Sequence, residues 1–259
     1  MLRLPLQQNS GFIALLLGMS ILIGCKSNSK KAEISETDFE KIENSEGKIQ
    51  KLLVGSFAEG DDQGIYQLDF NTETGLLSNS HRVAIESKPG YLYLSKNGDM
   101  VYSSNGTKPG SVSAFQWNDD KTALERVANL PSIGDGACYV GVSPEEHLVA
   151  AANYSSGSIV LYPLDDKGVI LEEPQGIQHT GSGPHPNQKS AHAHCVQFSQ
   201  NGKFLYAVDL GIDQILTYPI NSENKLGQAQ SRGGSTIGAR RRSKTSRLPS
   251  HSEHGFYYK

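Results

Sequence analysis

Four of the eight histidines of this 259-residue chain stand close together in the sequence, at His179, His185, His192 and His194. A neutral imidazole can accept a proton near pH 7, so a histidine is a natural general base. His192 and His194 are two residues apart, which places their side chains on one face of a strand. His194 is therefore the first candidate for chemistry, with His192 beside it. For His179 and His185, a surface loop or a satisfied strand end is the simpler interpretation.

The cysteines give no clear indication of a functional site. The three cysteines, Cys25, Cys138 and Cys195, form no CxxC pair, which disfavours a thiolate zinc site. Cys138 and Cys195 stand in apolar strand contexts typical of small buried residues, and a disulfide between them stays open. A metal shared by His192 and His194 lacks nearby carboxylate or thiolate ligands. The sequence predicts no metal and no cofactor.

Composition and charge narrow the fold class and the partners. The chain is 37% hydrophobic and 20% charged, with 27 glycines and 11 tyrosines, which favours a turn-rich β protein. The net charge is −3, but the stretch from Ser231 onward carries +6, so the preceding residues carry −9. Phosphate binding needs a basic footprint, so the acidic body argues against a nucleic-acid partner.

The first fifty residues predict export and anchoring. Phe12–Ile23 is an apolar run too short to span a bilayer but typical of a signal-peptide core, which gives a signal peptide over 1–24. Leu22–Cys25 resembles the bacterial lipobox, which implies acylation of Cys25. Residues 25–50 are polar and fit a lipidated, flexible linker. We expect a membrane-anchored lipoprotein on the periplasmic or cell-surface side.

From Lys51 a repeat begins. Tyr91–Tyr102, Tyr139–Ala150 and Cys195–Tyr206 each read as an alternating strand, a serine, a turn and a second apolar strand. A further strand begins near Ile65, Val112, Ile159 and Ile215, at spacings of 47, 47 and 56 residues, the longest of which contains an inserted loop over Gly176–Ser190. Short strands with a period of roughly 40–50 residues are typical of β-propeller blades.

Two details of the repeat bear on the site. Asn105, Asn153 and Asp209 end the second strand of successive units, where they either stabilise the strand end or line a central channel. Lys51–Phe57 matches a second strand rather than a first. The chain therefore begins its propeller in the middle of a blade.

These segments also carry a resemblance. LLVGSF, GIYQLDFNTETGLLS, ANYSSGSIVLYPL, GSGP and HAHCVQFSQNGKFLYAVDLGID are similar to the bacterial lactonase family of seven-bladed propellers, over Lys51 to about Gln230. That family includes propeller-type 6-phosphogluconolactonases and fungal 3-carboxymuconate lactonising enzymes. The resemblance implies an all-β, seven-bladed propeller fold, here an incomplete arc of about four blades over 51–230.

The resemblance also implies roles. It assigns the family's histidine to His194, and we expect His192 and Asp209 to support it. The family's arginine, in a Gly-Pro-Arg-His motif, and its glutamate are not found in this chain. Its Arg-Gln pair is Asn187-Gln188 here, and Tyr139 stands where relatives carry a histidine one blade earlier.

Residues 231–259 break the pattern. They show no strand alternation, and the sign of the charge reverses. Codons compatible with Ser243–Lys259, read two nucleotides earlier, can encode Gly-Pro-Arg-His followed by a blade-like segment. We therefore expect a disordered basic tail or an out-of-frame product of a frameshifted or truncated gene. Resequencing the locus tests this.

Three functions remain open at this point. The first is hydrolysis of a small-molecule lactone, such as a sugar lactone, by a truncated and impaired 6-phosphogluconolactonase-like chain. The second is a non-catalytic, surface-anchored propeller that binds a protein or glycan. The third and weaker is a carboxymuconate-type cycloisomerase, which would need several arginines, whereas residues 51–230 hold only Arg82 and Arg126.

Overall fold

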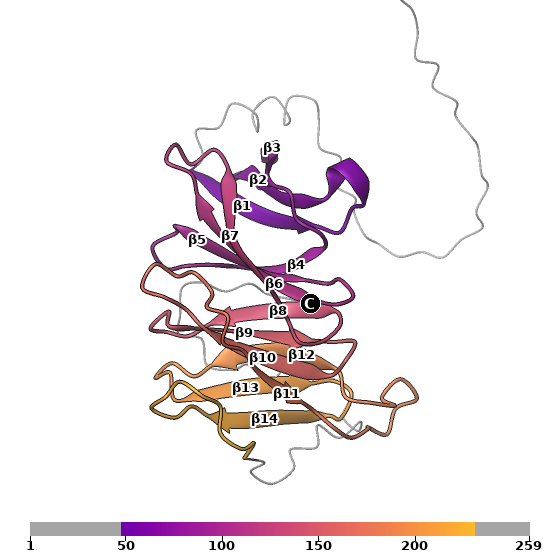
Figure 1. The fold of residues 1–259 in the computed structure, drawn as a ribbon. Helices are drawn as coiled ribbons and strands as arrows, with labels where there is room; N and C mark the ends of the chain where they lie inside the picture. The colour runs from indigo at the N-terminus through magenta and orange to yellow at the C-terminus, as the bar shows by residue number, and fades with distance from the viewer. Residues whose placement is uncertain (1–47, 231–259) are drawn as a thin grey trace, which may run out of the picture. The chain divides into compact units, whose positions relative to one another are not determined.

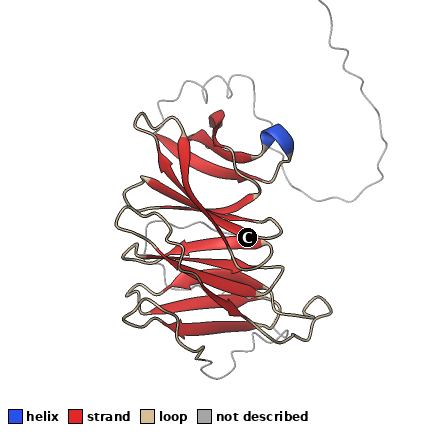
Figure 2. Ribbon diagram, viewed as in Figure 1, coloured by secondary structure: helices blue, strands red, loops and turns tan. Residues whose placement is uncertain are grey.

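The computed structural model describes residues 48–230, and this part is almost entirely β (Figure 2). Its one helix is the short 3-10 turn η1 (Gly60–Asp62), and nowhere in this part is a helix long and apolar enough for a membrane span. The strands are β1 (Ile49–Ser56), β2 (Gly64–Asn71), β3 (Leu77–Ala84), β4 (Pro89–Leu94), β5 (Met100–Asn105), β6 (Ser111–Trp117), β7 (Leu124–Pro131), β8 (Ala137–Val142), β9 (Leu148–Asn153), β10 (Ser158–Pro163), β11 (Gln175–Gln178), β12 (Ala193–Phe198), β13 (Phe204–Asp209) and β14 (Gln214–Pro219). The all-β prediction is confirmed.

The strands form four antiparallel sheets, which we call blades 1 to 4. Their strand orders are β1-β2-β3, β4-β5-β6-β7, β8-β9-β10-β11 and β12-β13-β14. The blades follow one another in chain order (Figure 1), because β1 contacts β4, β4 contacts β8 and β8 contacts β12. The sheets of the described part do not close into a ring. The prediction of about four propeller blades in an open arc is confirmed.

Each predicted strand–turn–strand segment is a hairpin, and its serine has a clear role. In β4–β5, β8–β9 and β12–β13 the serine hydroxyl oxygen accepts a hydrogen bond from the backbone N–H five residues later, at 2.9, 3.1 and 3.0 Å. The hydroxyl thereby closes the turn and satisfies a backbone donor. The serines are Ser95, Ser143 and Ser199.

Blade 1 confirms that the chain begins its propeller in mid-blade. β2, the repeat equivalent of β6, pairs with β1 and β3 as β6 pairs with β5 and β7, and no strand precedes β1 in its sheet as β4 precedes β5 within the described residues. β1 therefore occupies the place of a second strand. It begins at Ile49, two residues before the predicted start at Lys51.

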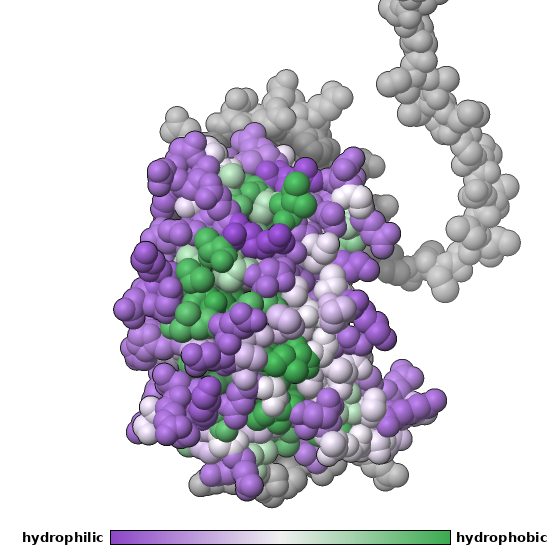
Figure 3. Space-filling model, in the orientation of Figure 1, coloured by the Kyte–Doolittle hydropathy of each residue, from purple (hydrophilic) through white to green (hydrophobic). Residues whose placement is uncertain are grey.

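The core lies between blades. One cluster joins blades 2 and 3, with Tyr102, Val140 and Val160 fully buried, and another joins blades 3 and 4 around Val196 and Leu205. Burying such a side chain stabilises the fold by about 1.5–3 kcal/mol, so each blade depends on its neighbours. Apolar side chains also reach the surface, as Figure 3 shows for one face. Exposed apolar residues of the described part include Val54 of β1, Ile85 just after β3 and Ile215 of β14.

Candidate functional site

His194 occupies a β-bulge on the first strand of blade 4. Ala193 pairs with Asp209 and Cys195 pairs with Val208, so His194 between them has no partner across the ladder. A bulge bends a strand and changes the direction of its side chains. His194 is exposed at this bulge. The backbone thus presents its imidazole at the surface instead of burying it between blades.

The same bulge recurs in blades 2 and 3, and it agrees with the alignment of the three repeat segments. The register shifts between Pro89 and Tyr91 in β4 and between Ala137 and Tyr139 in β8. The position of His194 one blade earlier is therefore Cys138, not Tyr139. Tyr139 corresponds to Cys195, as it already does in the aligned segments Tyr139–Ala150 and Cys195–Tyr206.

Cys138 is not prepared for chemistry of its own. Burial raises the pKa of its thiol to about 11, so the thiol stays protonated near neutral pH. Its sulfur lies 3.6 Å from the carbonyl oxygens of Ala193 and His194. Burial also raises the pKa of Cys195, and both thiols are free. These two cysteines behave as packing residues at the boundary between blades 3 and 4.

His192 lies just before β12 and is held through its backbone and its ring. Its N–H donates to Asp209 Oδ1 at 2.7 Å, and its carbonyl oxygen accepts from the N–H of Leu210 at 2.9 Å. Its ring Nδ1 lies 2.8 Å from the carbonyl oxygen of Tyr154. The imidazole also stacks on the Tyr154 ring, with centroids 4.7 Å apart. Tyr154, which we did not identify from the sequence, belongs to this site.

Asp209 makes no hydrogen bond to the imidazole of His192 or His194. Its carboxylate lies 2.7 Å from Nδ1 of His179, and the two side chains are only 0% and 1% exposed. It also accepts the backbone N–H groups of His192 and Gly211, at 2.7 and 2.9 Å. Burial alone raises the pKa of Asp209, but these hydrogen bonds, led by the one to His179, bring it below its ordinary value. Asp209 therefore supports the site only by fixing the backbone of His192.

The equivalents of Asp209 explain this arrangement. Asn105 and Asn153 are fully buried at the ends of β5 and β9. Asn153 Nδ2 donates to the carbonyl oxygen of Ser132 in the preceding loop at 2.8 Å, as Asp209 binds His179 in the loop before its own blade. Of the two expected roles, strand-end stabilisation fits these buried positions. His179, which follows β11, is accordingly buried and only half satisfied: its Nδ1 pairs with Asp209, whereas its Nε2 has no hydrogen-bond partner within residues 48–230, contrary to the expectation of a satisfied residue.

The inserted loop carries the other expected residues. His185 is exposed in it, and its N–H donates to Gln188 Oε1 at 2.9 Å. Gln188 Nε2 in turn donates to the carbonyl oxygen of Leu210 at 2.6 Å and to the Asp213 carboxylate. Gln188 thus ties the loop to blade 4. Asn187, its neighbour in the sequence, donates its backbone N–H to the ring of His185 at 3.2 Å.

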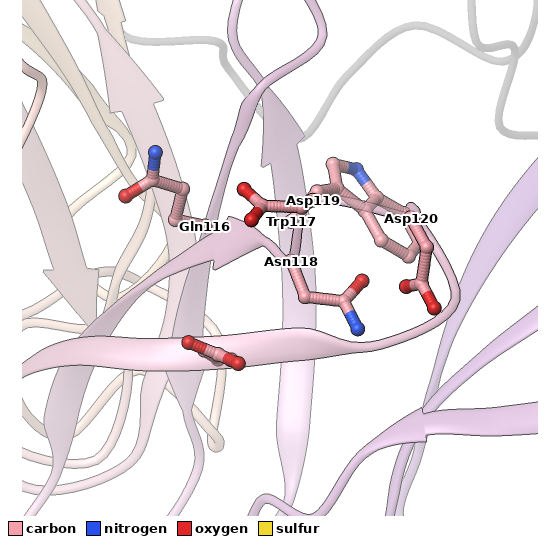
Figure 4. Close-up of a pocket in the computed structure, with 6 residues that line it drawn as sticks. Gln116, Trp117, Asn118, Asp119 and Asp120 are labelled. Atoms are coloured by element: carbon pink, nitrogen blue, oxygen red, sulfur yellow. The ribbon is translucent and has the colours of Figure 1, made fainter.

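Two hollows lie away from His192 and His194. An acidic one of about 450 Å³ lies at the β6–β7 turn and is lined by Asp119, Asp120 and Glu125. The side chains of Asp119 and Asp120 point in different directions (Figure 4). A second, of about 630 Å³, lies between β11 and β14 and includes His179. Within residues 48–230, no three His, Cys, Asp or Glu side chains gather as metal ligands. Cys25 and residues 231–259 lie outside the described residues.

Comparisons with known proteins bear on this site. A family model described as Lactonase, 7-bladed beta-propeller, matches residues 51–240. A 6-phosphogluconolactonase of Bacillus subtilis is 32% identical, over 64% of this chain and 48% of the relative. One of Formosa agariphila is 29% identical, over 66% and 50%. The structure of a periplasmic gluconolactonase of Pseudomonas aeruginosa has a TM-score of 0.65 at 27% identity, covering 71% of this chain and 53% of that one. The chain spans about half the length of these relatives.

Proposed function

Because the chain belongs to the seven-bladed lactonase propeller family, we propose that it carries the histidine-bearing part of a lactone-hydrolysing site. The observation that supports this is the exposed imidazole of His194 on its bulge, beside His192. In the proposed step, His194 takes a proton from water as the water oxygen attacks the lactone carbonyl carbon. The ring C–O bond then breaks, and the imidazolium returns the proton to the leaving oxygen. The product is a hydroxy acid.

The substrate class follows from the relatives. Two of them are named 6-phosphogluconolactonases, so we propose a sugar lactone of that kind. Hydrolysis also needs a cation or donors at the developing oxyanion. Arg126 of blade 2 instead pairs with the buried Glu86 at 3.4 Å, and Arg82 of blade 1 binds the backbone carbonyl of Asp61. These contacts also disfavour the cycloisomerase alternative, which needs free arginines.

Rates on a panel of sugar lactones test the proposal. We expect the full chain to hydrolyse at least one of them faster than buffer does. Since the family's arginine and glutamate were not found in the sequence, its rate should be about 10²–10³-fold below that of the Bacillus subtilis relative, the usual effect of losing an oxyanion donor. Base consumption at constant pH measures both. Equal rates for the two proteins would contradict the prediction that the site of this chain is impaired.

The non-catalytic propeller is the second candidate, and one observation favours it. In the described part of the chain, the imidazole of His194 has no carboxylate partner, and the only buried carboxylate–imidazole pair is Asp209–His179. An absence of acceleration on every lactone of the panel would favour a binding role. A protein or glycan would then be the ligand.

We propose that the chain is lipid-anchored through Cys25, facing the periplasm or the cell surface. The support is the apolar Phe12–Ile23 run followed by Gly24-Cys25. In cells fed labelled palmitate, the wild-type chain should carry label and sediment with membranes. Cys25→Ser should carry none, whereas the matched Cys138→Ser variant should stay labelled. Label on Cys25→Ser would exclude this anchor.

A further inference from the structure

The ring of Tyr154 lies against both candidate imidazoles. Tyr154 follows β9 in blade 3, whereas His192 and His194 belong to the start of blade 4. The Tyr154 ring is stacked on His192 at an interplanar angle of 20°, and it meets His194 edge-on, with centroids 5.4 Å apart and an angle of 81°. Both arrangements are favourable for aromatic rings. One side chain therefore joins the two histidines across the boundary between blades.

The hydrogen bond to Tyr154 also defines the protonation of the neutral His192 ring. A carbonyl oxygen only accepts, so Nδ1 of His192, 2.8 Å from the Tyr154 carbonyl oxygen, carries the proton. Nε2 of the neutral ring is then the atom with a free lone pair. Because this bond uses the backbone of Tyr154, it does not depend on the side chain at position 154. The stacking does.

His194 is held differently. No hydrogen bond links its ring to another residue within 48–230, and the bulge fixes only its backbone. The ring contact identified for it in this part is the edge-on contact with Tyr154. The orientation of the His194 imidazole therefore depends on the Tyr154 ring more than that of His192 does.

We propose that Tyr154 is a positioning residue, whose ring holds the His194 imidazole in the orientation needed for hydrolysis. The proposal rests on the proposed function for its kinetic consequence, but the ring contact exists without it. A general base must lie within hydrogen-bond reach of the attacking water, and a displacement of about 1 Å can cost about 10²-fold in rate. Loss of the Tyr154 ring should therefore lower kcat by about 10–10²-fold and change KM little.

The chain offers closely matched variants. Tyr154→Phe keeps the ring and removes a hydroxyl that makes no hydrogen bond to residues 48–230, whereas Tyr154→Ala and Tyr154→Leu remove the ring, the latter keeping apolar bulk. Tyr206→Ala removes a second tyrosine ring that is also 37% exposed, but on β13. Because Tyr154 is partly exposed, we expect all of these variants to fold.

Nuclear magnetic resonance of the full chain with labelled histidines tests the contact directly. The ring protons of His194 should move toward free-histidine shifts in Tyr154→Ala and Tyr154→Leu, and stay in place in Tyr154→Phe and Tyr206→Ala. The Nδ1–H form of neutral His192 should persist in all four. Unchanged His194 signals in Tyr154→Ala would overturn the proposal, and so would an equal displacement in Tyr206→Ala.

Kinetics separate this proposal from the proposed function. If wild type hydrolyses a lactone, kcat should fall in Tyr154→Ala and recover in Tyr154→Phe; an unchanged kcat in Tyr154→Ala would overturn the positioning role. If wild type hydrolyses no lactone, the proposed function fails for this chain. The His194 resonances then still decide whether Tyr154 orients that ring.

Discussion

Replacing Asp209 with alanine is expected to lower the free energy of unfolding by about 3 kcal/mol or more, because each buried donor left without its acceptor costs about 1–3 kcal/mol. Asp209 accepts hydrogen bonds from His179 and from the backbone N–H groups of His192 and Gly211. In Asp209→Ala all three donors lose their acceptor inside the fold. Urea denaturation of the full chain measures the loss as a lower midpoint.

The same carboxylate should make the free energy of unfolding fall at low pH, a fall that we call the acid limb. The pKa of Asp209 in the folded chain is lower than in the unfolded chain. Its ionisation therefore stabilises the fold fully above the unfolded pKa of about 3.9, and this contribution disappears as the pH falls through the lower folded pKa. Wild type should accordingly lose stability below about pH 4 more steeply than Asp209→Asn, which cannot ionise at this position.

Asn153 provides the neutral comparison for this prediction. It is the equivalent of Asp209 in blade 3 and is equally buried, but it carries no charge. Asn153→Ala should lower the unfolding free energy while leaving the acid limb of wild type in place. An Asp209→Asn variant with the same acid limb as wild type would show that another carboxylate is responsible.

Replacing His194 with alanine is expected to reduce kcat/KM for the best lactone by about 10²–10⁴-fold, the range of a general base. The loss should leave the fold intact, because His194 is exposed and its ring makes no hydrogen bond within residues 48–230. Rates at substrate concentrations around KM, with circular dichroism of the same samples, separate the chemical effect from unfolding.

His185→Ala is the matched control for this variant. His185 is also exposed and lies in the inserted loop before blade 4, but its hydrogen bonds are to Gln188 and Asn187 and not to His192 or His194. Its rate should match that of wild type. If His194→Ala retained full activity, the base would have to be sought elsewhere, and His192 would be the first residue to replace.

The inner part of each blade was predictable because the repeat is strongest there. The hairpins of blades 2 to 4 and the mid-blade start at β1 follow from alternating apolar residues and the aligned serines Ser95, Ser143 and Ser199. These strands are buried between blades, so their composition is restricted. The outer strands carry no such restriction. β3 is exposed over most of its length, and its residues LSNSHRVA give little strand signal.

The details of the site depended on contacts between distant residues. Asp209 binds His179, thirty residues away, and Tyr154 touches His192 from a different blade. Spacing within one segment cannot reveal such pairs, so Asp209 was assigned to His194, and Tyr154 was missed although the ANYSSG motif was recognised. Within the repeat, by contrast, the aligned segments already set Tyr139 opposite Cys195, which makes Cys138 the equivalent of His194.

The recurring bulge has a wider consequence for how this fold acquires an activity. The same backbone irregularity presents Gly90 in blade 2, Cys138 in blade 3 and His194 in blade 4. Three side chains as different as hydrogen, a thiol and an imidazole occupy it without altering the strand pairing around it. The surroundings of the bulge therefore decide what it can carry: a side chain at Gly90 would meet the ring of Phe57, and Cys138 packs against the backbone of blade 4. Only in blade 4, among the described blades, does the bulge leave an ionisable side chain exposed.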